Sequence, residues 1–176
     1  MNKKTMYIIV AILVIVIVIA GAAAYLLSNN GNGGTTNPTP TPSPTVSVAG
    51  AATLTFSANL TSQGQTTTYI WAGENLTAVM TLRVDFATYA YILDASQQKS
   101  WMSTDSGTTW TASTFATDWG TAAAPGFGNQ WADYMAQLAN WSGSGDYTYT
   151  NTAGEAIVLF NITVNPTIPA STFATS

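Results

Sequence analysis

Residues 76–93 read "LTAVMTLRVDFATYAYIL", and this stretch decides the fold class. Apolar residues occupy every second position, which is the pattern of a strand that buries one face. The alternation is interrupted at Ala87 and Thr88, where a short turn would return the chain. The stretch therefore predicts two antiparallel strands with a shared apolar face. The first strand contributes Leu76, Ala78, Met80, Leu82, Val84 and Phe86, and the second contributes Tyr89, Tyr91 and Leu93.

The same alternation occurs near both ends of the region that follows residue 47. One apolar row is predicted at the even-numbered residues of 54–60 and another at the even-numbered residues of 156–164. Glycines separate these runs and predict turns. We therefore predict a mainly β domain, built as one curved antiparallel sheet, a half-barrel-like meander with one apolar and one polar face.

One segment breaks the alternation: "NQWADYMAQLANW", residues 129–141. Its large apolar residues recur at helical spacing, which predicts one amphipathic helix packed on the sheet. Two interpretations of its apolar stripe stay open: the helix fills the core, or it covers a ligand cavity. Contact with anionic lipid is disfavoured because the segment has no Lys or Arg. The stripe comprises Trp131, Tyr134, Met135, Leu138 and Trp141.

The N-terminal region carries an uncharged apolar run over residues 6–27, long enough to span a bilayer as a helix. Lys3 and Lys4 precede it, which predicts a cytoplasmic N-terminus and an external C-terminal domain. A cleaved secretory signal and a prepilin leader are the alternatives to an uncleaved anchor. The predicted organisation is residues 1–5 in the cytoplasm, 6–27 as a transmembrane anchor, 28–47 as a Gly/Asn-rich then Thr/Pro-rich linker, and 48–176 as an extracytoplasmic β-rich domain.

The composition excludes several classes of function. The chain has no Cys and no His, which excludes zinc sites, cysteine nucleophiles and Ser-His-Asp triads. Eight acidic residues face four basic ones, so nucleic-acid binding is not expected. The acids form no recognisable pair for glycoside hydrolysis and no calcium loop. We therefore expect no enzyme, no cofactor and no metal.

Two local motifs add detail. Four N-x-[ST] sequons, at Asn59, Asn75, Asn140 and Asn161, are candidate glycosylation sites in an external domain. Residues 103–110, "STDSGTTW", resemble the Asp-box hairpin of sialidase-like propellers. The single copy predicts a structural hairpin, in which Asp105 accepts backbone N–H bonds and Gly107 supplies a positive φ.

The order of segments resembles the LolA-like lipoprotein-sorting family. The resemblance rests on a strand pair, "YILDASQQKSWMSTDSGTTW" (residues 91–110), a helix, and "DYTYTNTAGEAIVLFNITVNPTIPASTF" (residues 146–173). It implies a half-barrel whose concave face binds acyl chains, closed by a Pro-containing turn and a buried Phe173. The chain departs from the family in having a Thr/Pro linker where an N-terminal helix is usual.

We therefore expect a membrane-anchored, non-enzymatic domain in the cell membrane, single-pass, with its C-terminal domain outside. In the first hypothesis it binds a lipid or another apolar small molecule. In the second it is a structural cell-surface glycoprotein or pilin-like subunit with a filled core, whose partners are other surface proteins. The residues expected to contact an apolar ligand are Trp71, Met80, Leu82, Val84, Phe86, Trp131, Tyr134, Met135 and Leu138.

Overall fold

The computed structural model describes residues 47–121 and 126–175. The predicted anchor at residues 6–27 and the linker as far as residue 46 lie outside the described residues. Within the described part of the chain, no helix has both the length and the apolar character needed to cross a membrane. The elements are β1 (Leu54–Ser62), β2 (Gln65–Glu74), β3 (Thr81–Phe86), β4 (Tyr89–Asp94), β5 (Lys99–Ser103), β6 (Thr111–Ser113), α2 (Phe115–Trp119), α3 (Phe127–Leu138), β7 (Tyr147–Thr150), β8 (Ala156–Val164) and the 3-10 helix η1 (Ala170–Phe173).

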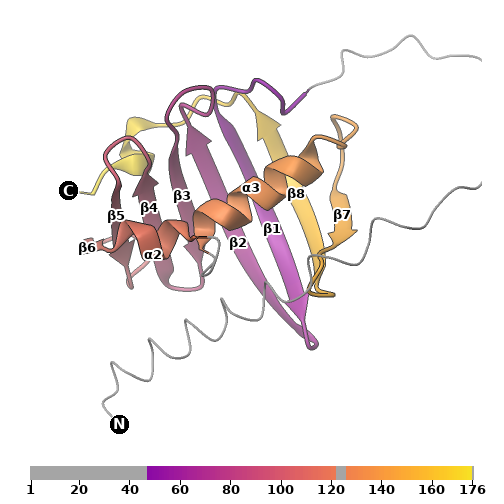
Figure 1. The fold of residues 1–176 in the computed structure, drawn as a ribbon, viewed down its shortest axis with the longest axis horizontal. Helices are drawn as coiled ribbons and strands as arrows, with labels where there is room; N and C mark the ends of the chain where they lie inside the picture. The colour runs from indigo at the N-terminus through magenta and orange to yellow at the C-terminus, as the bar shows by residue number, and fades with distance from the viewer. Residues whose placement is uncertain (1–46, 122–125, 176) are drawn as a thin grey trace, which may run out of the picture.

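All eight strands belong to one open antiparallel sheet in the order β6-β5-β4-β3-β2-β1-β8-β7 (Figure 1). The first six strands form a meander in which each strand pairs with the next one. After the two helices the chain returns with β7 and β8, and β8 pairs with the free side of β1. The predicted mainly β, antiparallel architecture is confirmed.

The tight connection between β1 and β2 shows how local residues set the register. Ser62 pairs with Gln65, so only Gln63 and Gly64 form the turn. Both have positive φ, 51° and 77°, as a type I′ hairpin requires. This register places the even-numbered residues of β1 and the odd-numbered residues of β2 on the same face.

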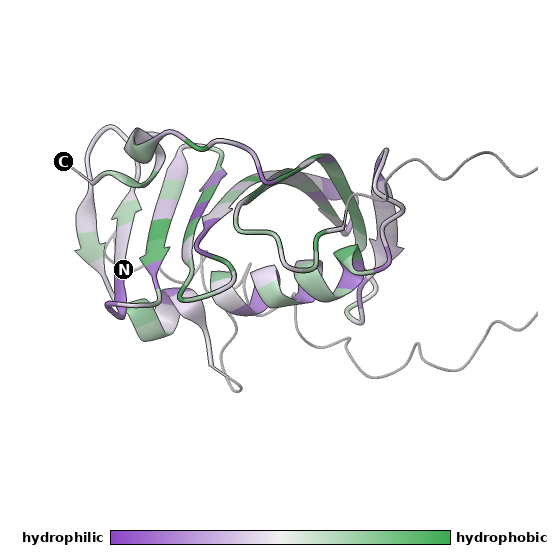
Figure 2. Ribbon diagram, turned by 90° about the horizontal axis from the view of Figure 1, so that it is seen from above, coloured by the Kyte–Doolittle hydropathy of each residue, from purple (hydrophilic) through white to green (hydrophobic). Residues whose placement is uncertain are grey.

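Helices α2 and α3 cover one face of the sheet, which we call the helix face (Figures 1 and 2). The apolar row of β1 lies on this face and is buried, as its alternation predicted. The chain that follows β8 crosses the opposite face, the tail face, where η1 lies against β3. The buried core on the helix face comprises Leu54, Phe56, Ala58, Leu60, Tyr69, Trp71, Leu82, Val84, Leu93, Phe127, Trp131, Tyr134, Leu138, Ile157 and Leu159.

Two apolar rows differ from the predicted alternation: one is shorter, and the other is shifted in phase. The row over residues 76–86 is a strand only from Thr81, because Asn75 has φ 55° and a turn follows in which Ala78 N–H donates to Asn75 O. In the last row, Ile157 and Leu159 are buried rather than Ala156 and Val158. A β-bulge near Asn161, which has φ 54°, then changes the phase, so that Ile162 also packs against the core.

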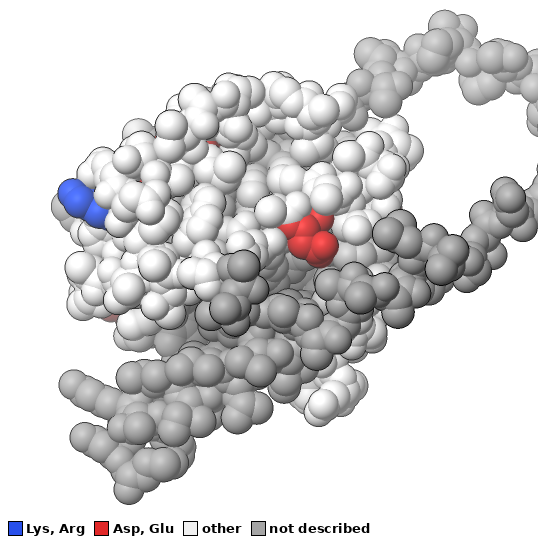
Figure 3. Space-filling model, viewed as in Figure 1, with Lys and Arg blue, Asp and Glu red and all other residues white. Residues whose placement is uncertain are grey.

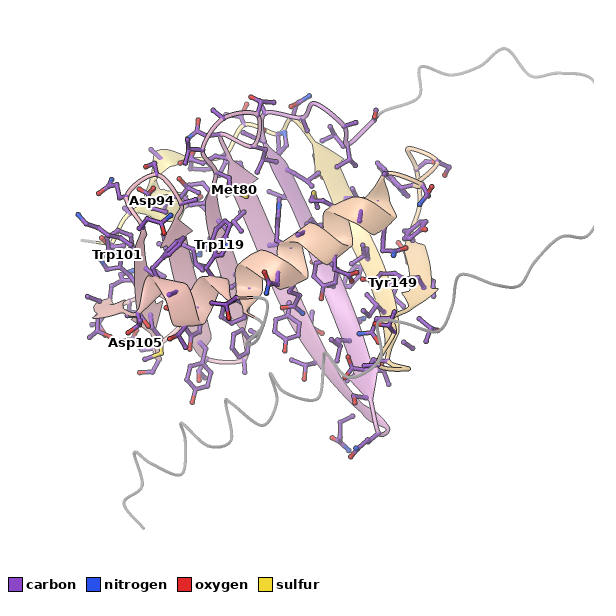
Figure 4. The ribbon with its side chains drawn as sticks, viewed as in Figure 1. Met80, Asp94, Trp101, Asp105, Trp119 and Tyr149 are labelled. Carbon is purple, nitrogen blue, oxygen red and sulfur yellow. The ribbon has the colours of Figure 1, made fainter. Side chains whose placement is uncertain are left out.

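The predicted helix is present, shifted toward the N-terminus of its segment. It begins at Phe127 and ends at Leu138, so Trp141 follows the helix and donates its Nε1–H to Gly145 O at 2.9 Å. The short helix α2 was not predicted. It packs on α3 through Trp119 (Figure 4): a Cβ on Gly128 would lie 2.5 Å from the indole ring of Trp119. Glycine therefore allows the two helices to touch.

Candidate functional site

The structure brings all nine predicted ligand-contacting residues to the helix face. Trp71 and Trp131 lie in the buried core, and Met80, Phe86 and Met135 pack against it while half-buried. The prediction could group these residues because residues of one face of a strand and one stripe of a helix must meet. The remaining members, Leu82, Val84, Tyr134 and Leu138, are buried.

Aromatic rings occupy the space between the sheet and α3. The ring of Phe56 lies at the centre, with its centroid 5.4 Å from Trp131, 5.7 Å from Tyr134 and 6.2 Å from Trp71. The ring centroids of Trp71 and Trp131 are 5.8 Å apart. These are direct ring contacts. At this position the helix packs on the sheet without an intervening ligand-sized gap.

Two further residues belong to this cluster although neither was among the predicted contacts. Phe56 already lay on the predicted apolar face of residues 54–60, which was the signal that could have identified it. Phe127 precedes the predicted helix. Its ring centroid lies 4.8 Å from that of Tyr91 and 5.8 Å from that of Phe86. The apolar periodicity of residues 129–141 could not place Phe127, because Phe127 joins the apolar stripe of α3 only when the helix begins at that residue.

The core contains two buried polar atoms that have no hydrogen-bond partner among the described residues: Trp71 Nε1 and Glu155 Oε1. The Trp71 ring meets Tyr134 at 85° and Phe127 at 69°, so both rings stand edge-to-face with the indole. Glu155 is 3% exposed, and its other carboxylate oxygen accepts a bond from Asn151 at 2.8 Å.

Tyrosines and carboxylates gather toward β7 at one end of this core. Tyr149 O–H donates to Asp133 on α3 at 2.7 Å, and Gln130 donates to Tyr134 at the same distance. Burial raises the pKa of Tyr149, and the hydrogen bond to Asp133 raises it further. Burial is also the main reason that the pKa of Tyr134 is raised. Figure 4 shows Tyr149 at the β7 side, and Figure 3 shows one acidic patch on an otherwise almost uncharged view of this face.

A cavity of about 390 Å³ lies on the tail face, which the sequence did not single out as a site. Its volume falls within the range of small-ligand sites. It combines hydroxyl groups, one amide, an ion pair and an apolar floor. We call it the tail-face cavity, and it is lined by Thr55, Phe56, Ser57, Ile70, Trp71, Ala72, Arg83, Asp85, Asn161 and Thr172.

Arg83 joins the sheet to the C-terminal tail beside this cavity. Its Nε and Nη2 both donate to Asp85, each at a shortest distance of 2.9 Å, and its Nη1 donates to Thr172 O at 2.8 Å. Its guanidinium carbon lies 5.6 Å from the ring centroid of Trp110. All the donor nitrogens of Arg83 therefore have partners within the domain, and the tail is held as one wall of the cavity.

The predicted Asp-box turn has the expected local geometry. Asp105 Oδ1 accepts from the backbone N–H of Thr108 at 3.1 Å and of Thr109 at 2.8 Å, and Gly107 has φ 85°. Hydrogen bonds from the hydroxyls of Ser103 and Thr109 and from this backbone lower the pKa of Asp105 to about 2. Because its carboxylate closes the turn through these hydrogen bonds, Asp105, labelled in Figure 4, has a structural role here.

The candidate glycosylation sites differ in exposure. Asn75, Asn140 and Asn161 are exposed. Asn59 is half-buried, and its Oδ1 accepts from Thr68 Oγ1 at 2.7 Å. Asn161 is the sequon residue that lines the tail-face cavity. Among the described residues, no group of three or more His, Cys, Asp or Glu side chains is placed to hold a metal ion.

Comparison with known proteins gives no relative. No protein-family description, no curated protein and no solved structure matches this chain.

Proposed function

We propose that the chain is a membrane-tethered, non-enzymatic domain displayed outside the cytoplasm, where it acts as a structural cell-surface domain with a filled core. The observation that supports this proposal is the packing of Phe56, Trp71, Trp131 and Tyr134. All four side chains are at most 3% exposed. The apolar stripe of α3 is therefore used for packing on the sheet, as in an ordinary core.

The location can be tested by labelling, because the chain contains no native cysteine. Gln63→Cys would place a thiol at the exposed β1–β2 turn, and Asn2→Cys would place one at the N-terminus. In intact cells, a membrane-impermeant maleimide should label the first variant and not the second. Both should react after lysis. Labelling of Asn2→Cys alone would contradict display outside the cytoplasm.

The filled core can be tested with an apolar dye that fluoresces on binding. The wild-type chain should bind no dye in its core. Trp131→Ala should create a cavity and bind the dye, since cavities left by large core residues accept small apolar molecules. Stoichiometric dye binding by the wild-type chain would contradict the proposal.

Binding of a lipid or other apolar ligand under α3 is the second candidate function. The observation that favours it is the unpartnered Trp71 Nε1, which a polar atom of a ligand could accept from. Mass spectrometry of lipids extracted from the purified full-length chain separates the two functions. One tightly retained species at constant stoichiometry would favour binding, and its repeated absence would favour the structural role.

A further inference from the structure

We infer that the tail-face cavity holds a sugar, the first residue of an N-linked glycan attached to Asn161. This inference rests on the proposed display outside the cytoplasm, where such glycans are attached. It assigns both a modification site and an occupant to this cavity, whose lining includes a sequon residue. The occupant is an oligosaccharide whose first ring packs on the protein and whose remainder extends into solvent.

The backbone presents Asn161 for this role. The β-bulge in β8 and the positive φ of Asn161 place an exposed amide on the wall of the cavity, in the part of the strand that pairs with β1 alone. The side-chain amide of Asn161 makes no hydrogen bond to another described residue. Thr163, the third residue of the sequon, is also exposed. Bulges commonly redirect a side chain next to a functional site.

The cavity matches a neutral sugar in its chemistry. Thr55, Ser57 and Thr172 contribute hydroxyls, while Arg83 is already occupied by Asp85 and by Thr172 O, so no unpaired positive charge attracts an anion. A sugar ring has hydroxyl edges for such groups and an apolar C–H face for an aliphatic surface.

Ile70 supplies that aliphatic surface. It is 56% exposed, one of two large apolar residues identified as exposed in the described chain. It lies on β2, separated from β8 by β1 alone, so about 10 Å separates it from Asn161 at ~4.8 Å per strand. A glycosidic link and one ring can cover that distance. A glycan there would shield an apolar side chain that is otherwise open to water.

The attachment is ordinary group transfer from a host donor. Asn161 Nδ2 forms a bond to C1 of the first sugar, and the bond from C1 to a phosphate oxygen of a lipid-linked oligosaccharide breaks. The phosphate-bearing lipid carries away the bonding electrons, and the amide nitrogen gives up one proton to a base. The donor and the transferase belong to the host cell, and the exposed Asn161 lies in the part of β8 that β7 does not cover.

The full-length chain should be produced in a cell that attaches N-linked glycans, as wild type and as Asn161→Gln, with Asn75→Gln as the matched control. Asn75 is an exposed sequon residue that does not line the cavity. Glycopeptide mass spectrometry should find sugar on Asn161. Loss of this glycan should lower Tm by about 3–5 °C, whereas Asn75→Gln should change it by less than about 1 °C.

A second variant isolates the packing contact. Ile70→Ser should lower Tm by about 3 °C in the glycosylated chain and change it little when Asn161→Gln is also present. Equal effects of Ile70→Ser on Tm in both backgrounds would overturn the inference that the sugar packs on Ile70 in the cavity. Sugar on Asn75 or Asn140 without sugar on Asn161 would overturn the modification site while leaving external display intact. Absence of sugar from every sequon would count against both proposals.

Discussion

Gly73→Ala tests whether α3 packs directly on the sheet. Gly73 lies in β2 beneath Trp131, and a Cβ added there would be 2.7 Å from Trp131 Cη2 and 2.9 Å from Leu76 Cδ2. Ordinary carbon contacts are ~3.5–4.0 Å, so the indole would have to withdraw by about 1 Å. Such overpacking costs ~1–3 kcal/mol.

The substitution also has a favourable component, because replacing glycine in a strand by alanine recovers ~0.5–1 kcal/mol of backbone entropy. The net expectation is a loss of ~1–2 kcal/mol in the free energy of unfolding and a fall in Tm of about 5 °C. The assay is urea unfolding followed by tryptophan fluorescence, with thermal unfolding by circular dichroism.

Trp131→Leu provides the matched background. It is destabilising alone, but it removes the ring that the new methyl group would strike. Gly73→Ala should then be clearly less destabilising than in the wild-type background, because only the contact with Leu76 Cδ2 at 2.9 Å remains. The expected coupling between the two positions is ~1–2 kcal/mol. Additive effects, or a stabilising Gly73→Ala in the wild-type background, would refute direct packing of helix on sheet.

Four other changes test the polar contacts. Arg83→Lys should lower the free energy of unfolding by ~1–2 kcal/mol, measured by urea unfolding, and expose the C-terminal tail to proteolysis, because lysine cannot make the forked contact or stack on an aromatic ring. The pKa of Asp105 is lowered to about 2, so the stability that its ionised carboxylate contributes is present above about pH 4 and is lost as the pH falls toward about 2. Asp105→Asn should remove this part of the acid dependence, measured by urea unfolding at several pH values. The pKa values of Tyr134 and Tyr149 are raised by burial, so stability should be lost as the pH rises above about 10, with tyrosinate absorbance and loss of circular dichroism coinciding. Glu155→Gln should raise the free energy of unfolding by ~1 kcal/mol, measured by urea unfolding, because an amide is less costly to bury than a carboxyl group with one unpartnered oxygen; a loss would show that Oε1 has a partner.

The sequence could predict which residues lie together on the helix face, but it could not predict the shape of the space between them. Trp71, Leu82 and Trp131 were grouped correctly because one face of a strand and one stripe of a helix must both be buried. A filled core and a ligand cavity both require apolar residues at every second position of a strand, so the sequence looks the same in either case. The distances from Phe56 to its neighbours distinguish them, and those distances depend on how far α3 approaches the sheet.

The sequence by itself determined the features that depend on neighbouring residues. These are the alternation of residues 54–60 and 81–86, the helical stripe of α3 and the Asp105 turn, each set by contacts within a few positions. Only the tertiary structure decided the pairing of β8 with β1, the bulge at Asn161 and the crossing of the tail onto the face opposite the helices. These depend on contacts between residues about a hundred positions apart, such as Arg83 with Thr172, which no local period records. The tail-face cavity exists only because those distant segments meet.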